Sequence, residues 1–199
     1  MRPLILALVV LLAPVAASAA GPPIASGAYE DSLLVGYDPA SNVVTGYFSM
    51  EMGLQPKFSC IFYLEGKLKG SAAAIRTYYP DTPTEDEITG ALTLDGPGRL
   101  QIALPSEHGG CWNVWHFADK GDPANFLLET AHPWTSVAVV KSAKAYFYDT
   151  PGGGAHRRAY VVNGDGVGVR TSQSGWLQVD YVGGAKPISG WLRRSDVYP

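Results

Sequence analysis

Residues 144–199 read KAYFYDTPGGGAHRRAYVVNGDGVGVRTSQSGWLQVDYVGGAKPISGWLRRSDVYP. Short runs of aromatic and β-branched residues alternate here with turn-forming Pro, Gly and Asp, which is typical of short antiparallel strands. Within the stretch 175–179, positions 177 and 179 share one face of a strand, and positions 176 and 178 share the other. Gly190, just before Trp191, lets the chain bend as it closes a small barrel. The segment therefore predicts a small β-barrel.

Four features of this segment follow one another in a fixed order. They are a first strand that runs into a Pro turn at Pro151, a Gly-Asp turn at 164–165, a Gly-Trp-x-x-Val strand at 175–179, and a late Gly-Trp-Leu at 190–192 followed by an acidic residue. In this order they resemble the bacterial SH3-like family. The resemblance implies an SH3-like barrel that works as an accessory binding module, without chemistry of its own, for peptidoglycan peptides or other protein segments.

A barrel this short cannot bury every aromatic ring that it contains. We therefore expect an exposed groove lined by some of five rings, namely Tyr146, Tyr148, Trp176, Tyr181 and Trp191. The alternative is that the two tryptophans, Trp176 and Trp191, are simply part of the core.

The region before this segment also reads as short strands separated by turns. The expected strands are 33–37, 43–52, 58–64, 72–79, 88–94 and 100–104, with a turn at Gly66 and hairpins at 33–52 and 88–104. This spacing predicts an all-β chain that begins with a small antiparallel β-sandwich or barrel. The segments 126–128 and 134–140 can pack on this first domain or lead into the second. We expect domains at 21–140 and 141–199.

The N-terminus has the pattern of a secretory signal peptide over residues 1–20. Arg2 supplies a positive start, residues 4–12 are all apolar, and Ala17-Ser18-Ala19 is a small-x-small cleavage site. The alternative, an uncleaved membrane anchor, is disfavoured because the apolar run is shorter than the roughly 20 residues that span a bilayer. We expect a periplasmic or secreted protein, with no membrane span after signal removal.

The sequence contains two cysteines, Cys60 and Cys111. An even pair in an exported protein predicts a disulfide. Closing a loop of about 50 residues stabilises a fold by roughly 4 kcal/mol in the chain-entropy model. The competing interpretation makes Cys111 a nucleophile with His108 or His116 as its base.

Charge is divided unevenly along the chain. Residues 21–140 contain six Lys/Arg and fourteen Asp/Glu, a net charge of −8, whereas residues 141–199 contain eight and four, a net charge of +4. Two units with different surfaces follow from this asymmetry. The four histidines have no metal-ligand spacing, and no catalytic triad or phosphate-binding loop is present. We therefore expect no enzyme activity, no metal and no cofactor.

One further segment, 105–110, is Gly-rich and leads directly into Cys111. A loop held at its base by a disulfide suits presentation to a partner, with Glu107 and His108 as candidate contacts; it can equally be a plain turn. The leading functional hypothesis is an exported inhibitor or immunity-type protein that blocks a wall-degrading enzyme. The alternative is a module that binds peptidoglycan or peptides through the SH3-like groove. We expect no nucleic-acid partner.

Overall fold

The computed structural model describes residues 24–54 and 57–198. This part of the chain is all-β, as predicted, and its helical segments are short 3₁₀ turns only. The predicted signal peptide, residues 1–20, lies outside the described residues. Within them, no helix is long and apolar enough to cross a membrane.

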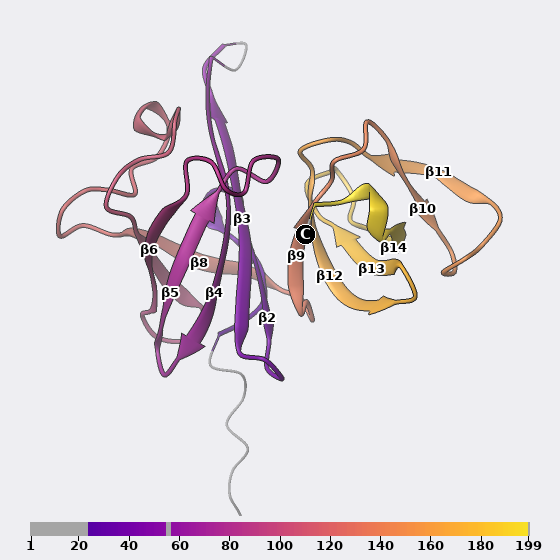
Figure 1. Ribbon diagram of the computed structural model, residues 1–199, viewed down its shortest axis with the longest axis horizontal. Helices are drawn as coiled ribbons and strands as arrows, with labels where there is room; N and C mark the ends of the chain where they lie inside the picture. Colours follow the sequence, from indigo (N-terminus) through magenta and orange to yellow (C-terminus); the bar gives the residue numbers. More distant parts are fainter. Residues whose placement is uncertain (1–23, 55–56, 199) are drawn as a thin grey trace, which may run out of the picture.

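The first unit is a closed antiparallel barrel of strands β1 to β8, at the left of Figure 1. The strands are β1 (Gly27–Tyr29), β2 (Leu33–Asp38), β3 (Val43–Met52), β4 (Phe58–Lys69), β5 (Ala72–Tyr78), β6 (Ile88–Leu94), β7 (Arg99–Ala103) and β8 (Ala124–Ala131). Each strand pairs with the next along the chain, and β8 pairs with β1. Of the two predicted architectures, sandwich or barrel, the chain adopts the barrel.

Both predicted hairpins of the first unit are confirmed as the pairs β2–β3 and β6–β7. The predicted turn at Gly66 is wrong, because β4 runs on through this residue to Lys69. Gly66 is instead a ladder position between Val44 and Ile75. An added Cβ there would collide with the Ala74 carbonyl, so the glycine serves close strand packing rather than a turn.

The barrel core is built around four phenylalanine rings that contact one another. They are Phe48, Phe62, Phe117 and Phe126, with ring centroids 4.9–6.1 Å apart. The Cys60–Cys111 disulfide joins β4 to the 3₁₀ turn η2 (Cys111–Asn113) at the edge of this core, so the predicted pairing is confirmed. The thiol of Cys111 is therefore not free to act as a nucleophile.

The second unit is a sheet with the strand order β11-β10-β14-β13-β12-β9, at the right of Figure 1. Its strands are β9 (Ser136–Val139), β10 (Ala145–Tyr148), β11 (His156–Val161), β12 (Gly166–Gln173), β13 (Trp176–Tyr181) and β14 (Ile188–Arg193), followed by η3 (Arg194–Asp196). The core of this unit includes Phe147, Val179 and Leu192. Of the two segments left open by the sequence, 126–128 belongs to the barrel, whereas 136–139 pairs with β12 in the second sheet.

The two units are joined by direct hydrogen bonds as well as by the chain. The Tyr63 hydroxyl donates to the carbonyl of Val137 (2.8 Å), and the backbone N–H of Val137 donates to the Thr45 hydroxyl (2.8 Å). Gly36 on β2 lies against the backbone of Ser136, where an added Cβ would have no room. These hydrogen bonds are buried, and the backbones of the two units come into direct contact beside them. The barrel and β9 therefore pack tightly against each other.

Trp134, just before β9, connects the linker to the second sheet. Its indole lies on β12 at Gly168, and its Nε1–H donates to the Asp180 carboxylate (2.8 Å). Asp180 is buried and also accepts from Arg170 Nε (2.7 Å) and Ser189 Oγ (2.6 Å). Burial alone would raise the pKa of Asp180, but the three hydrogen bonds together with the Arg170 charge lower it.

Candidate functional site

One face of the second sheet carries a row of aromatic rings that contact one another, and Tyr148 within it is buried, with 6% of its surface exposed. In order, the rings are Tyr160, Tyr146, His156, Tyr148 and Trp176, with successive centroid distances of 5.6, 4.1, 6.1 and 4.8 Å. We call these five residues the aromatic row. It crosses strands β11, β10 and β13, so rings far apart in sequence form one surface.

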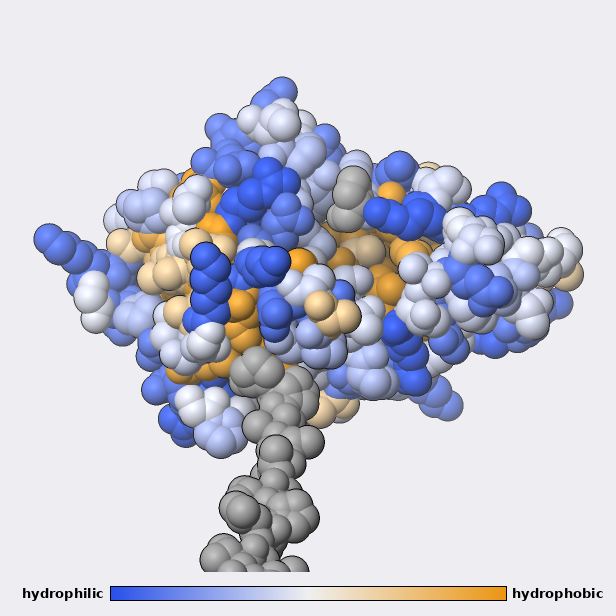
Figure 2. Space-filling model, turned by 60° about the horizontal axis from the view of Figure 1, so that its bottom comes forward, coloured by the Kyte–Doolittle hydropathy of each residue, from blue (hydrophilic) through white to orange (hydrophobic). Residues whose placement is uncertain are grey.

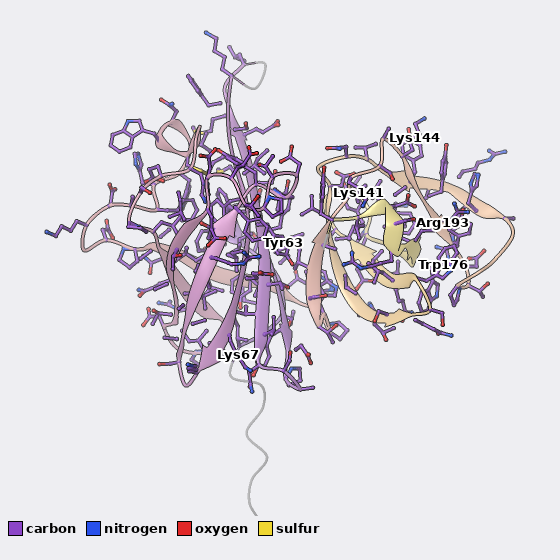
Figure 3. All side chains as sticks on the ribbon, viewed as in Figure 1. Tyr63, Lys67, Lys141, Lys144, Trp176 and Arg193 are labelled. Atoms are coloured by element: carbon purple, nitrogen blue, oxygen red, sulfur yellow. A yellow bond between two sulfur atoms is a disulfide. The ribbon has the colours of Figure 1, made fainter. Side chains whose placement is uncertain are left out.

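A cation stands at each end of the aromatic row; Figure 3 labels both cations, Lys144 and Arg193, on the second unit. The Lys144 ammonium lies 4.6 Å from the centroid of the Tyr160 ring. At the other end, the Arg193 guanidinium lies 5.4 Å from the Tyr148 ring and 5.8 Å from the Trp176 ring. Among the described residues, neither cation forms an ion pair with a carboxylate. Both charges therefore remain available to an anionic ligand.

Strand alternation explains why these side chains share a face. Tyr146 and Tyr148 stand two residues apart on β10, with the buried Phe147 between them pointing into the core. On β14, Leu192 is buried, whereas Trp191 and Arg193 point outward. Because successive residues of a strand point to opposite faces, each outward ring is paired with an inward apolar neighbour. The local sequence thus builds the core and the row together.

Four of the five predicted groove rings lie on this face of the sheet, but Tyr148 is buried there, so the prediction that it lines an exposed groove is wrong. Tyr146, Tyr148 and Trp176 belong to the aromatic row, and Trp191 stands directly opposite Tyr148 in the β10–β14 register. Trp176 and Trp191 are half-buried, so neither is a core residue in the way that Phe147 is. Sequence reasoning left out His156, Tyr160 and the two flanking cations. The signal was available, because His156 and Tyr160 are four residues apart on one strand face.

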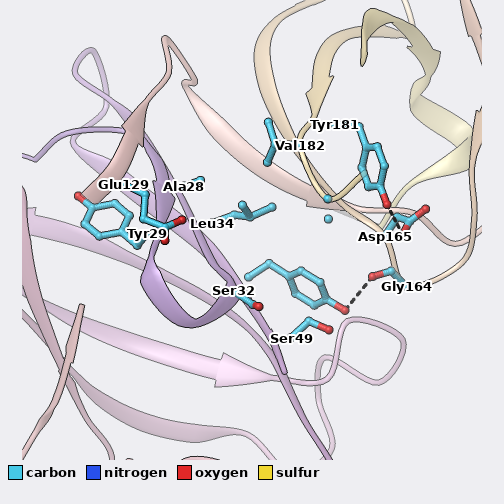
Figure 4. Close-up of a pocket in the computed structure, with 13 residues that line it drawn as sticks. Ala28, Tyr29, Ser32, Leu34, Ser49, Glu129, Gly164, Asp165, Tyr181 and Val182 are labelled. Atoms are coloured by element: carbon cyan, nitrogen blue, oxygen red, sulfur yellow. Dashed lines mark hydrogen bonds between the residues drawn. The ribbon is translucent and has the colours of Figure 1, made fainter. Parts of the chain in front are cut away.

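Tyr181 lies away from the row, in a cleft between the two units (Figure 4). This first cleft has a volume of about 330 Å³ and is walled by the barrel on one side and by residues 164–166 and 181–183 on the other. The Tyr47 hydroxyl donates to the Gly164 carbonyl at its floor (2.9 Å). The Tyr181 hydroxyl donates to Asp165 (3.3 Å). Tyr181 therefore belongs to a different surface from Trp176.

A second cleft of about 360 Å³ lies at the other flank of Tyr47. It is lined by residues of both units, including Tyr79, Asp81 and Tyr198. The space-filling view shows that apolar side chains reach the surface where the barrel meets the second unit (Figure 2). The pKa of Tyr47 is raised, first by burial and then by nearby carboxylates that include Asp165 and Asp81. The junction is therefore both aromatic and negatively charged.

The two candidate contacts of the 105–110 loop are directed inward. Glu107 Oε1 accepts hydrogen bonds from the backbone N–H groups of Phe117 and Ala118, both at 2.9 Å. His108 is buried, stacks on Phe62 and has Nε2 2.7 Å from the Thr77 hydroxyl. In this position both side chains hold the loop closed, and neither projects toward solvent.

A different part of the barrel projects outward, namely the described residues where β3 ends and β4 begins, 52–54 and 57–58, which we call the β3–β4 tip; the end of β3 rises above the barrel in Figure 1. Around the tip, Met52, Leu54 and Phe58 are exposed by 47%, 98% and 43%. Sequence reasoning treated 43–52 and 58–64 as ordinary strands. It missed the tip because a buried strand and a protruding hairpin can have the same pattern of apolar residues in the sequence.

No family model, no curated protein and no solved structure matches this chain. Among the described residues, no group of three or more His, Cys, Asp or Glu side chains is arranged to hold a metal ion. The candidate site is therefore defined by its own geometry, a positively flanked aromatic row on one unit and a negatively charged junction beside it.

Proposed function

We propose that this chain is an exported binding protein of the cell envelope whose second unit, an SH3-like module, holds an anionic peptide over the aromatic row. The observation that supports this best is the row itself, with Lys144 at one end and Arg193 at the other. Ring faces accept the backbone and aliphatic groups of an extended peptide, and unpaired cations favour its carboxylates.

Peptidoglycan stem peptides have the required chemistry. They are short and extended, and they carry free carboxylates along a backbone with small side chains. The net charge of +4 over residues 141–199 attracts such a ligand to this unit rather than to the acidic barrel. The disulfide and the signal-like N-terminus are compatible with an envelope location.

The proposal involves binding without a chemical step. Cys111, the nucleophile of the competing interpretation, is bonded to Cys60. His108, one of its two candidate bases, is buried, and its Nε2 lies 2.7 Å from the Thr77 hydroxyl. Binding alone is thus the role for which the structure offers positive support.

The test is binding of the purified, oxidised protein to isolated cell wall and to a soluble stem peptide. We expect Trp176→Ala to weaken binding by tenfold or more, since buried aromatic contacts dominate such interfaces, and Arg193→Gln to weaken it about threefold to tenfold through loss of a charge-assisted hydrogen bond. Trp112→Ala is the matched control, because Trp112 is a 66% exposed tryptophan on the barrel.

The Arg193→Gln variant is expected to keep the native fold, because it retains a long polar side chain at an exposed position. Circular dichroism of each variant establishes that the fold is retained. Equal binding by the native protein, the Trp176 variant and the Arg193 variant would refute the proposal.

A second candidate function, inhibition of a wall-degrading enzyme, is favoured by the β3–β4 tip. A projecting tip with an almost fully exposed leucine, Leu54, has the shape of a segment that enters a partner's cleft. The acidic barrel behind it, within the −8 region, would steer a basic enzyme toward the tip.

The two functions are separated by two substitutions. If the protein is an inhibitor, Leu54→Asp abolishes inhibition of a lytic enzyme while Trp176→Ala leaves it intact. If it is the proposed peptide-binding module, Leu54→Asp leaves binding to the cell wall unchanged. An inhibition assay and a wall-binding assay on the same two variants give the answer.

A further inference from the structure

The first cleft, between the barrel and the second unit, combines aromatic walls with carboxylates from both units. Figure 4 shows Glu129 on the barrel side and Asp165 on the opposite wall, and Tyr47 also lines the cleft. Among the described residues that line this cleft, none is Lys, Arg or His. Negative charge on two facing walls is therefore not neutralised from within the cleft.

The Asp165 carboxylate is held in a fixed orientation. Its Oδ2 accepts the backbone N–H of Val162 (2.7 Å), and its Oδ1 accepts the Tyr181 hydroxyl (3.3 Å). A carboxylate oxygen has two acceptor positions, so each oxygen keeps one for a further donor. Glu129, by contrast, is exposed and free to adjust its position to a ligand.

Two tyrosines supply the aromatic part of the cleft. Tyr47 is fixed because its hydroxyl is bonded to Gly164 across the junction, and Tyr181 is fixed by its bond to Asp165. Rings with negative faces beside carboxylates attract cations with a partly apolar surface. The raised pKa of Tyr47, caused by burial and then by Asp165, Asp81 and Glu51, agrees with a negative potential at this position.

We propose that the first cleft is a binding site for an organic cation, an ammonium or guanidinium group presented at the end of an aliphatic chain. Its volume of about 330 Å³ is at the lower end of the range for small-ligand pockets. A lysine-sized side chain suits this lining: Tyr47 and Leu34 offer apolar surface to its methylene groups, and Glu129 and Asp165 offer carboxylates to its charge. This site is independent of the aromatic row, which has charge of the opposite sign.

The probe is Nα-acetyl-lysine methylamide, which has a free ε-ammonium group. We expect it to shift the amide NMR signals of residues 28–34, 129, 164–166 and 181–183 in the oxidised protein. Nα-acetyl-norleucine methylamide, which has the aliphatic chain without the charge, should bind at least tenfold more weakly. Shifts of similar size with both probes, or shifts confined to the aromatic row, would overturn the proposal.

Substitutions identify the carboxylates. Asp165→Asn and Glu129→Gln should each weaken binding of the lysine probe about threefold, as expected for a partly exposed charge pair. Asp95→Asn, the same change at an exposed turn between β6 and β7, should have no effect. Unchanged binding in the Asp165→Asn, Glu129→Gln double variant would also overturn the site.

The same titration separates the two sources of such a cation. Cadaverine, a free diamine, has the same ammonium and alkyl chain as lysine but no peptide groups. If cadaverine binds as tightly as the lysine probe, the site takes a free amine. If the lysine probe binds more tightly, the site takes a basic side chain of a polypeptide.

Discussion

His108 is a polar ring in the barrel interior, and its protonation state follows from its neighbours. The Thr77 hydroxyl donates to the Ile88 carbonyl (2.9 Å), so it can only accept from His108, whose Nε2 therefore bears the proton. Burial lowers the pKa of His108 below its ordinary value of 6.5. The neutral ring, packed on Phe62, is the form that the fold holds.

This predicts a pH dependence of stability. Above pH 6.5 His108 is neutral in both the folded and the unfolded chain, and its contribution to stability is fully present. As the pH falls from 6.5 toward the lower pKa of the folded state, the unfolded chain binds the proton more readily, so the free energy of unfolding decreases. Urea denaturation at pH 7.5 and pH 5.5 measures the decrease.

His108→Gln removes the titrating group and should reduce the difference between the two pH values. A His108→Gln variant with an unaltered pH dependence would contradict the assignment.

At the residue scale, the sequence predicted that aromatic rings gather on the second unit, but it did not predict which rings belong to the aromatic row. Alternation within 175–179 predicted that Leu177 and Val179 share one face and Trp176 the other; the first two are buried, whereas Trp176 is half-buried. Tyr181 differs from Trp176 by five positions on β13, an odd number, so the two side chains point to opposite faces. The first cleft could not be predicted from the sequence, because Tyr47 and Asp165 come together only when the two units pack against each other.

Among the elements, β12 is held in place by the Trp134 indole. Gly168 provides the flat backbone surface on which the ring lies, and a Cβ there would overlap the ring. The same indole donates to Asp180 on β13, so ring contact and hydrogen bond act on neighbouring strands. The linker before β9 is thereby fixed against the sheet.

Gly168→Ala should therefore destabilise the protein by about 1–3 kcal/mol, the usual cost of inserting a methyl group into packed structure. Gly154→Ala is the control, because a Cβ at that position meets only open space and should change stability by less than about 0.5 kcal/mol. The midpoints of urea unfolding, followed by circular dichroism, compare the two variants. Equal midpoints would show that the Trp134 contact is not needed.

Strands that are separated by short polar turns could be predicted from the sequence. The sheet to which a strand belongs could not be predicted where its pairing partner is distant in the sequence. Polar turns between β2 and β3 and between β6 and β7 marked both hairpins correctly. Residues 126–128 lie in β8, which pairs with β7 and with the distant β1. Residues 136–139 form β9, which pairs with β12. Local pattern contains no information about such partners.

In the whole molecule, the barrel and the second unit are expected to unfold together. The buried Tyr63 hydroxyl spans the junction to Val137, so Tyr63→Phe should lower the free energy of unfolding by about 1 kcal/mol. Tyr160→Phe, which alters a ring that is 42% exposed, should change it by less than about 0.5 kcal/mol.

Tryptophan fluorescence and far-ultraviolet circular dichroism should report one common midpoint in the native protein. In Tyr63→Phe both signals should shift by the same amount. Separate midpoints for the two signals would show that the units unfold independently.

The two units also present opposite charges on separate surfaces. The aromatic row and its cations suit an anionic peptide, whereas the first cleft with Glu129 and Asp165 suits a cation. Because the junction contacts fix the units against each other, the two surfaces keep a constant relative orientation. Two ligands bound at these proposed sites would therefore be held at a fixed distance and orientation from each other.

The disulfide between Cys60 and Cys111 also makes the stability of the barrel depend on the redox state of its surroundings. Their sequence separation is 51 residues, so the bond contributes about 4 kcal/mol in the chain-entropy model once it forms. Disulfides persist in oxidising compartments and are rare where thiols are kept reduced. If the chain is exported, as we propose, the barrel gains this stabilisation only after export.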